Sequence, residues 1–170
     1  MKCASQNLVS VTREDPSGPA ATRLIAALSA ELGGRYGDDG TGGFRPDDVQ
    51  GPGGAFVVAW LGERAVGCGA LRPLAPGVGE LKRMFVAGDA RRQGIARRIL
   101  EALETTARER GYEALRLETG TLQPEAIDLY ESAGYQRIAP YCLYADDPLS
   151  VCFEKRLPGN DEGGTREGNG

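Results

Sequence analysis

The side chains available for acid–base chemistry are restricted, because the 170-residue chain contains no histidine. A Ser-His or Cys-His pair and a histidine-ligated metal are therefore excluded, and we expect no metal site. Any proton acceptor must be Glu, Asp, Tyr, Cys or an ordered water. The four cysteines form no CxxC pair, and Cys68 and Cys152 fall within apolar, strand-like runs. We expect these two to be buried thiols rather than nucleophiles.

A short basic segment, Arg91-Arg92-Gln93-Gly94-Ile95-Ala96, lies where an apolar strand gives way to an amphipathic helix. Free backbone N–H groups at a helix N-terminus, with the helix dipole behind them, bind anions such as a diphosphate. Gly94 and Ala96 leave room for close approach, and the arginines add positive charge. The same pattern also occurs as a solvated helix start, so the residues alone leave both interpretations open. The P-loop and the dinucleotide glycine pattern are absent from the sequence.

The first part of the chain must supply elements that support this segment. A strand is expected over 8–12, and Pro16-Ser17-Gly18-Pro19 opens a helix that Gly33-Gly34 ends. Residues 33–54 are rich in Gly, Asp and Pro, and we expect either a functional lid or a disordered segment. Acidic residues in this stretch form either a negative mouth over a substrate or ordinary solubilising charges; they are Asp38, Asp39, Asp47 and Asp48.

The rest of the chain predicts the centre of the fold. The helix after the basic segment has an apolar stripe, leaves charges such as Glu104 for solvent, and ends at Gly111. The strands on either side of it should pair in parallel through this helical crossover. The order of elements predicts one α/β (α+β) domain with a mixed sheet and helices on both faces. The other expected elements are strands 55–61 and 65–74 joined by Gly62-Glu63, strands 80–87 and 112–119, a helix from Pro124 to Gly134, and strands 135–138 and 150–154.

Composition sets the class of protein. Hydrophobic residues make up 41% and charged residues 26%, which suits one globular domain over 1–157, followed by a disordered tail over 158–170. The net charge of −4 disfavours a nucleic-acid partner. The sequence has no signal peptide and no apolar run of about 18 residues, so we expect no membrane partner and a cytoplasmic protein with reduced thiols.

Two stretches, ELKRMFVAGDARRQGIARRIL (80–100) and ALRLETGTLQPEAIDLYESAGYQRI (114–138), closely resemble the GNAT acetyltransferase superfamily. In that family Arg or Gln, two residues, Gly, one residue, then Gly or Ala form the diphosphate loop for coenzyme A. Arg91, Gly94 and Ala96 match this pattern. The resemblance covers residues 55–153. It implies a mostly antiparallel sheet that is splayed between two central parallel strands, and acetyl-CoA as cosubstrate.

The resemblance also implies how the cosubstrate is held. The pantetheine arm would fill the gap between the parallel strands and pair with the main chain of Met84, Phe85 and Val86. Gln123 stands where many family members have Asn, and its longer side chain would keep a polar contact. The diphosphate would lie on the loop and the first helical turn, formed by Arg91, Arg92, Gln93, Gly94, Ile95, Ala96 and Arg97.

Direct transfer of the acetyl group to an amine requires a proton acceptor and a proton donor. The resemblance makes Glu80 the first candidate for the general base, alone or through water, against the alternative of a surface charge beside Lys82. Glu118, on the adjacent strand, is the reserve candidate. Tyr130 matches the family tyrosine that protonates the thiolate, against the alternative of a core aromatic residue.

The resemblance therefore implies an acetyl-CoA-dependent N-acetyltransferase acting on a primary amine. The acceptor stays open between a small cationic amine, an amino acid, and a peptide or protein amine, with the acidic composition favouring the first. The alternative is a non-catalytic, regulatory domain that binds acyl-CoA. Family members often pair, so a homodimer is compatible with the resemblance.

Overall fold

The computed structural model describes residues 8–37 and 44–159. Within them a sheet of seven strands runs in the order β1-β2-β3-β4-β5-β7-β6, and all neighbours are antiparallel except β4 and β5. The mixed, mostly antiparallel sheet is thereby confirmed. The strands are β1 (Val9–Arg13), β2 (Ala55–Leu61), β3 (Arg64–Ala75), β4 (Val78–Val86), β5 (Ala114–Gly120), β6 (Gln136–Ile138) and β7 (Ser150–Arg156).

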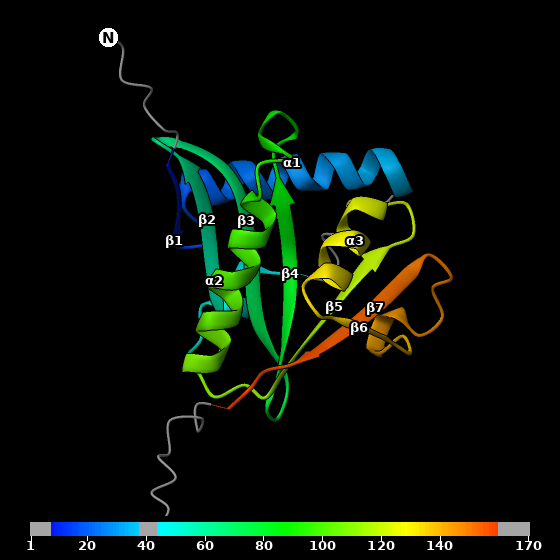
Figure 1. Cartoon of the computed structure of the whole chain (residues 1–170). Helices are drawn as coiled ribbons and strands as arrows, with labels where there is room; N and C mark the ends of the chain where they lie inside the picture. The colour runs from blue at the N-terminus through cyan, green and yellow to red at the C-terminus, as the bar shows by residue number, and fades with distance from the viewer. Residues whose placement is uncertain (1–7, 38–43, 160–170) are drawn as a thin grey trace, which may run out of the picture.

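Helices cover both faces of this sheet, as predicted (Figure 1). On one face, α2 (Ile95–Glu109) and α3 (Pro124–Ser132) share a core with Leu81 and Leu117. On the other face, α1 (Pro19–Tyr36) packs in a second core with apolar residues of β2 and β3. Three short 3-10 helices complete the described elements: η2 (Pro46–Val49), η3 (Gly88–Ala90) and η4 (Cys142–Tyr144).

The two central parallel strands pair over only part of their length. Val78–Leu81 of β4 align with Ala114–Leu117 of β5, and beyond these residues the strands diverge (Figure 1). A bulge lies in β4 just after this point, because Arg83 has a φ of 55° and the register with β3 shifts. Since a bulge bends its strand and increases the local twist, it helps to turn β4 away from β5.

The first helix is longer than its sequence predicts. It continues through Gly33 and Gly34 to Tyr36 and ends at Gly37, which has a left-handed φ of 73° and donates its N–H to the Gly33 carbonyl. A glycine inside a helix costs about 1 kcal/mol relative to alanine. Arg35 and Tyr36 offset this cost because both hydrogen-bond to the backbone just before α3. The prediction that Gly33-Gly34 ends the helix is therefore wrong.

The second helix buries a charge that its amphipathic pattern places at the surface. Glu104 is only 6% exposed. Its carboxylate accepts hydrogen bonds from Tyr135 Oη at 3.0 Å and Lys155 Nζ at 3.1 Å. A buried carboxylate is stable only with such partners, and these lie 31 and 51 residues away in sequence. The expectation that Glu104 faces solvent is wrong for this reason.

Part of the Gly-rich stretch packs against the sheet. Phe44 and Val49 are buried, and Asp48 of η2 forms an ion pair with Arg72 of β3 at 3.1 Å. These contacts fix residues 44–54 beside β3. Asp38 and Asp39 lie outside the described residues, as do residues 160–170 of the expected tail.

Candidate active site

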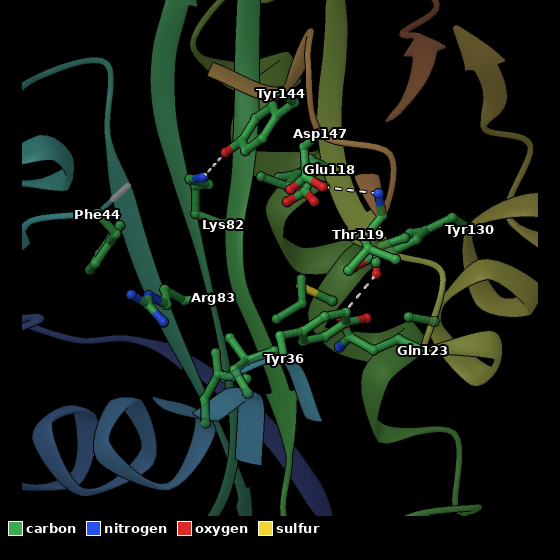
Figure 2. Close-up of a pocket in the computed structure, with 17 residues that line it drawn as sticks. Tyr36, Phe44, Lys82, Arg83, Glu118, Thr119, Gln123, Tyr130, Tyr144 and Asp147 are labelled. Atoms are coloured by element: carbon green, nitrogen blue, oxygen red, sulfur yellow. Dashed lines mark hydrogen bonds between the residues drawn. The ribbon is translucent and has the colours of Figure 1, made fainter. Parts of the chain in front are cut away.

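A pocket of about 470 Å³ opens where β4 and β5 separate (Figure 2). Four of the predicted site residues line it: Met84, Glu118, Gln123 and Tyr130. The pocket extends to both faces of the sheet, because α3 and α1 each contribute to its wall. The complete lining is Leu28, Leu32, Tyr36, Phe44, Leu81, Lys82, Arg83, Met84, Glu118, Thr119, Gly120, Gln123, Ala126, Tyr130, Tyr144, Asp147 and Leu149.

The N-terminus of α2 is open. Gly94 precedes the helix with a left-handed φ of 76° and provides no side-chain cap, and a Cβ at Gly94 would lie more than 4 Å from every described residue other than its two chain neighbours. Arg92 is exposed and also has a positive φ, of 65°. Free amides of a helix terminus attract an anion. The geometry of the segment is compatible with a bound diphosphate, which stays a prediction.

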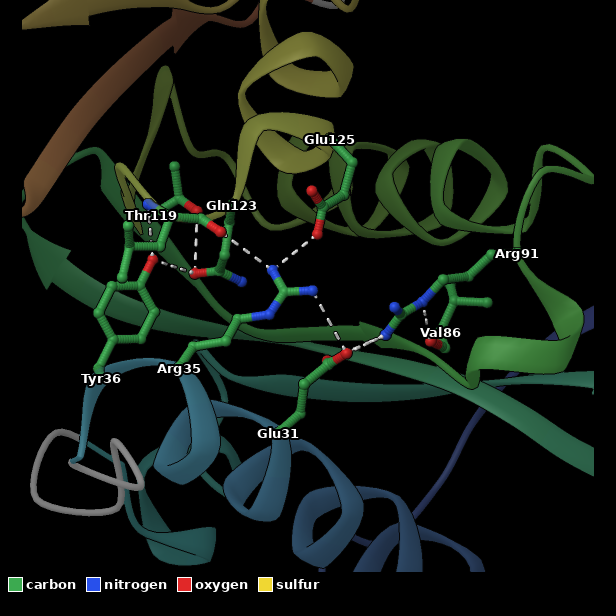
Figure 3. Close-up of polar contacts among 9 residues, drawn as sticks. Glu31, Arg35, Tyr36, Val86, Arg91, Thr119, Gln123 and Glu125 are labelled. Carbon is green, nitrogen blue, oxygen red and sulfur yellow. Dashed lines mark hydrogen bonds and ion pairs between the residues drawn. The ribbon is translucent and has the colours of Figure 1, made fainter.

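Arg91 contacts β4 and α1, and the amino-acid sequence did not predict these contacts. Its Nε donates to the Val86 carbonyl at 2.9 Å, and its Nη2 donates to both oxygens of Glu31 on α1, at 2.7 and 2.9 Å (Figure 3). Glu31 also lies 3.6 Å from Arg35, which pairs with Glu125 of α3 at 2.8 Å. A chain of alternating charges therefore links the loop before α2, the end of α1 and the start of α3.

The end of α1 also holds Gln123. Tyr36 Oη accepts a hydrogen bond from the Leu122 N–H at 3.1 Å and donates to Gln123 Oε1 at 3.4 Å. Gly120 has to be glycine for this arrangement, because a Cβ at that position would overlap the Tyr36 ring. The structure thus places Gln123 on the pocket wall with its amide oxygen directed toward Tyr36 and Thr119 (Figure 3).

Glu118 is the predicted carboxylate that reaches the pocket. It stands on β5 one residue beyond the last pair with β4. Ser150 donates to its Oε1 at 3.0 Å, and no hydrogen bond to its Oε2 comes from any residue the structure describes. Burial raises the pKa of Glu118, because the charged form loses water. A carboxylate of this kind is suited to accept a proton.

Glu80 is placed differently. It is only 1% exposed and does not line the pocket. Arg72 binds its Oε1 at 2.6 Å and Tyr141 donates to its Oε2 at 2.7 Å. The interpretation of Glu80 as a surface charge is therefore wrong. The carboxylate joins β3, β4 and the segment before η4, and both its oxygens already accept hydrogen bonds.

Tyr130 enters the pocket from α3. Its ring packs against Tyr135 and Phe153, with centroids 5.8 and 6.0 Å away, so the residue is also part of the core. Its hydroxyl makes no hydrogen bond to the residues described. Burial and the charge of Glu118 raise the pKa of Tyr130, so the phenol carries its proton at neutral pH.

Several residues of the pocket wall were not predicted as site residues from the sequence. Lys82 lies on β4 two residues after Glu80, and that alternation could have placed it on the same face as the candidate bases. Tyr144 and Asp147 come from the segment between β6 and β7, where no periodic pattern exists. Phe44 lies within the Gly-rich stretch and packs against Arg83, whose guanidinium lies 5.5 Å from the ring centre.

The cysteines behave as predicted where the structure describes them. Cys68 and Cys152 are buried, and burial raises the pKa of the Cys68 thiol to about 12. Among residues 8–37 and 44–159, no cluster of acidic and cysteine side chains could hold a metal ion. None of the helices in those ranges is long and apolar enough to cross a membrane.

Sequence comparisons agree with this geometry. The profile of the Acetyltransferase (GNAT) family matches residues 22–135. An IAA acetyltransferase of Azospirillum brasilense is 39% identical over 150 residues, which is 88% of this chain and 98% of that protein. An uncharacterized N-acetyltransferase of Bacillus subtilis, YsnE, is 40% identical over 65% of this chain and 75% of its own length. The chain belongs to the GNAT acetyltransferase family, whose members use acetyl-CoA.

Solved structures share the fold. A proposed acyl-CoA N-acyltransferase of Klebsiella pneumoniae superposes with a TM-score of 0.76 and 34% identity, covering 89% of this chain and 99% of that one. A GNAT acetyltransferase of Elizabethkingia anophelis with acetyl-CoA bound has a TM-score of 0.64 and 18% identity, over 89% of this chain and 99% of its own. At that identity the second likeness concerns the fold alone.

Proposed function

We propose that this acetyltransferase transfers the acetyl group of acetyl-CoA directly to a primary amine. In this proposal Glu118 accepts a proton and Tyr130 donates one. The observation that carries the proposal is that both side chains line one pocket, which opens at the point where β4 and β5 separate.

The main chain around the pocket suits the cosubstrate. Beyond Leu81 and Leu117 the facing edges of β4 and β5 no longer pair with each other. Such strand edges bind extended, amide-bearing segments, so Met84 and Val86 are suited to the pantetheine arm. Gly94 and the first turn of α2 would hold the diphosphate. When bound, acetyl-CoA supplies a thioester carbonyl that is open to attack by an amine.

The proton transfers balance between two side chains. The neutral amine attacks the carbonyl carbon, so that a carbon–nitrogen bond forms and the carbon–sulfur bond breaks. Glu118 takes the proton that the nitrogen loses, and Tyr130 gives its proton to the departing sulfur. Return of a proton from Glu118 to Tyr130 restores both groups, and the charge of Glu118 already acts on Tyr130.

Glu118 replaces Glu80 as the preferred base in this proposal. Glu80 is tied to Arg72 and Tyr141 and stands outside the pocket lining. Both oxygens of Glu80 already accept hydrogen bonds, so neither is free to take a proton from an amine in the pocket. Glu118 has no cationic partner within hydrogen-bonding distance among the residues described, and burial raises its pKa.

The test is release of thiol from acetyl-CoA by the purified protein with a panel of amines. The panel holds polyamines, amino acids, and peptides with free N-termini, and IAA, which the name of the Azospirillum brasilense relative contains, is assayed separately as a compound without a primary amine. Turnover with at least one amine, lost in Glu118→Gln, is the expected result. Binding of acetyl-CoA without thiol release from any acceptor would instead support the non-catalytic alternative.

A further inference from the structure

The pocket also contains a cationic side chain, Lys82, to which the proton transfers assign no role. Lys82 and Glu118 follow Leu81 and Leu117, the last residues in register between β4 and β5. Neighbouring parallel positions point to the same face of a sheet, and Leu81 and Leu117 point to the face of α2. Lys82 and Glu118 therefore project to the opposite face, where Phe44 and Tyr144 also lie in the lining (Figure 2).

Lys82 is a partly buried cation without a carboxylate partner in the described part of the chain. Its Nζ donates to Tyr144 Oη and lies 5.0 Å from the centre of that ring. Glu80, two residues earlier, pairs instead with Arg72. Removing a cation from water is unfavourable unless an anion compensates it, so a pocket that keeps Lys82 is suited to a ligand anion.

The charges around Lys82 separate into two kinds. Arg83 and Arg72 add positive charge to its surroundings, whereas Glu80 and Glu118 add negative charge. The Glu80 charge is offset by Arg72, and two acids, Glu118 and Asp147, line the pocket. Each accepts one hydrogen bond, from Ser150 at 3.0 Å and from the Leu149 N–H at 2.9 Å, and Glu118 is the acid that stands on the strand next to Lys82. The lining thus presents a cation and an acid side by side.

We infer that the acceptor amine also carries a carboxylate, which pairs with Lys82 while the amino group meets Glu118. An α-amino acid has both groups on one carbon, and Lys82 and Glu118 occupy equivalent positions on adjacent strands, each directly after the last pair of the ladder. Phe44, Tyr144 and Leu149 offer apolar surface to the rest of the molecule. The acceptor is accordingly an amino acid with an apolar side chain rather than a polyamine or a simple alkylamine.

This inference rests on the proposed function, and matched acceptors test it separately. Two sets of acceptors keep the primary amine and the side chain but differ at the carboxylate. The aromatic set is L-phenylalanine, L-phenylalaninamide and 2-phenylethylamine, and the aliphatic set is L-leucine, L-leucinamide and 3-methylbutylamine. Each is assayed for thiol release at saturating acetyl-CoA. We expect kcat/KM to be at least about tenfold higher for the carboxylate-bearing member of each set, because a paired charge is lost in the others.

Variants assign the preference to Lys82. Lys82→Met should reduce the preference to less than about threefold, and Lys82→Arg should keep most of it, because the guanidinium also pairs with a carboxylate. Lys155→Met is the matched control: Lys155 pairs with Glu104 and lies outside the pocket lining, so the preference should stay at the value of the unmodified protein.

The outcomes separate the two claims. Equal kcat/KM within each set, or an unchanged preference in folded Lys82→Met, would overturn the inference and leave the proposed function standing. The ratio in the unmodified protein decides the matter even where Lys82→Met does not fold. Absence of thiol release from every acceptor, with acetyl-CoA still bound in calorimetry, would overturn the proposed function and this inference together.

Discussion

Leu81 of β4 and Leu117 of β5 form the last pair of the parallel ladder, and the active-site pocket opens at this point, with Leu81 in its lining. The three side chains that bear on the proposed chemistry line this pocket: Lys82 from β4, Glu118 from β5 and Tyr130 from α3. The loss of strand pairing thus creates the opening and also places the reactive groups around it.

Tyr130→Phe should lower kcat by about 100-fold, which is a usual contribution of a positioned proton donor. The KM for acetyl-CoA should change little, because the ring and its packing on Phe153 remain. Steady-state kinetics measure both constants. The matched control is Tyr135→Phe, which removes a hydroxyl bonded to Glu104 and should affect stability but not kcat. Full activity of Tyr130→Phe would remove Tyr130 from the mechanism.

Glu118→Gln should lose activity by about 100-fold or more, because the amide cannot accept the proton. In the unmodified enzyme kcat/KM should rise with pH through the Glu118 pKa, which burial raises above the usual 4.5. A pH profile of initial rates measures this limb. Its persistence in Glu118→Gln would assign the limb to another group.

The same substitution should stabilise the protein at neutral pH, by about 1 kcal/mol. A raised carboxyl pKa means that the folded chain binds the proton more tightly than the unfolded chain. Glu118 therefore contributes its full share to the free energy of unfolding below pH 4.5, the usual pKa of a Glu side chain, and this contribution is lost as pH rises through the raised Glu118 pKa. Urea unfolding of both proteins at several pH values measures the difference between their free energies of unfolding. A difference that does not change with pH would contradict this prediction.

Glu80→Gln should destabilise the fold by about 3 kcal/mol, because it leaves Arg72 partly buried without its main partner. The rate per folded molecule should stay within about threefold of the unmodified enzyme, since no role in proton transfer is assigned to Glu80. Urea unfolding and active-site-normalised rates give the two quantities. A folded, stable and inactive Glu80→Gln would return the role of general base to Glu80.

Glu31→Gln should tighten acetyl-CoA binding by about threefold at low salt, because the Glu31 carboxylate competes with the diphosphate for Arg91. The gain should shrink as ionic strength rises. Glu109→Gln is the control, since it removes an ion pair of equal length, 2.7 Å, from Arg13 on a distant surface. Weaker binding in Glu31→Gln would show instead that Glu31 positions Arg91 for the diphosphate.

The sequence predicts those parts of the fold that depend on local patterns. The strand and helix around Arg91, the left-handed Gly111 after α2 and the helix opened by Pro124 all follow from short-range signals and are confirmed. The end of α1 cannot be predicted from such local signals. The contacts of Tyr36 with the segment before α3, 86 residues away, offset the helix-breaking tendency of two glycines. The prediction that Glu104 is exposed is wrong for the same reason, since its hydrogen-bond partners, Tyr135 and Lys155, are distant in the sequence.

In the candidate site, too, the sequence identifies residues within the matching stretches but not the long-range contacts that these residues make. The family resemblance leads to Glu118 and Tyr130 because both stand in its second matching stretch, residues 114–138, and the structure brings both to the pocket. It also leads to Glu80, whose neighbours Arg72 and Tyr141 no motif reveals. Lys82 lies within the first matching stretch, residues 80–100, yet its place in the pocket depends on the face to which β4 turns it, which only the sheet register defines.

In the proposed function the N-terminus of α2 binds the diphosphate of acetyl-CoA, and calorimetric titration of acetyl-CoA into Gly94 variants measures this contribution. Gly94→Ala carries the cost of a left-handed φ without added charge and should bind within about tenfold of the unmodified protein. Gly94→Glu carries the same backbone cost but places a carboxylate at the anion site, and it should bind at least about 100-fold more weakly while remaining folded by circular dichroism. Equal affinity of Gly94→Glu and Gly94→Ala for acetyl-CoA would contradict the account.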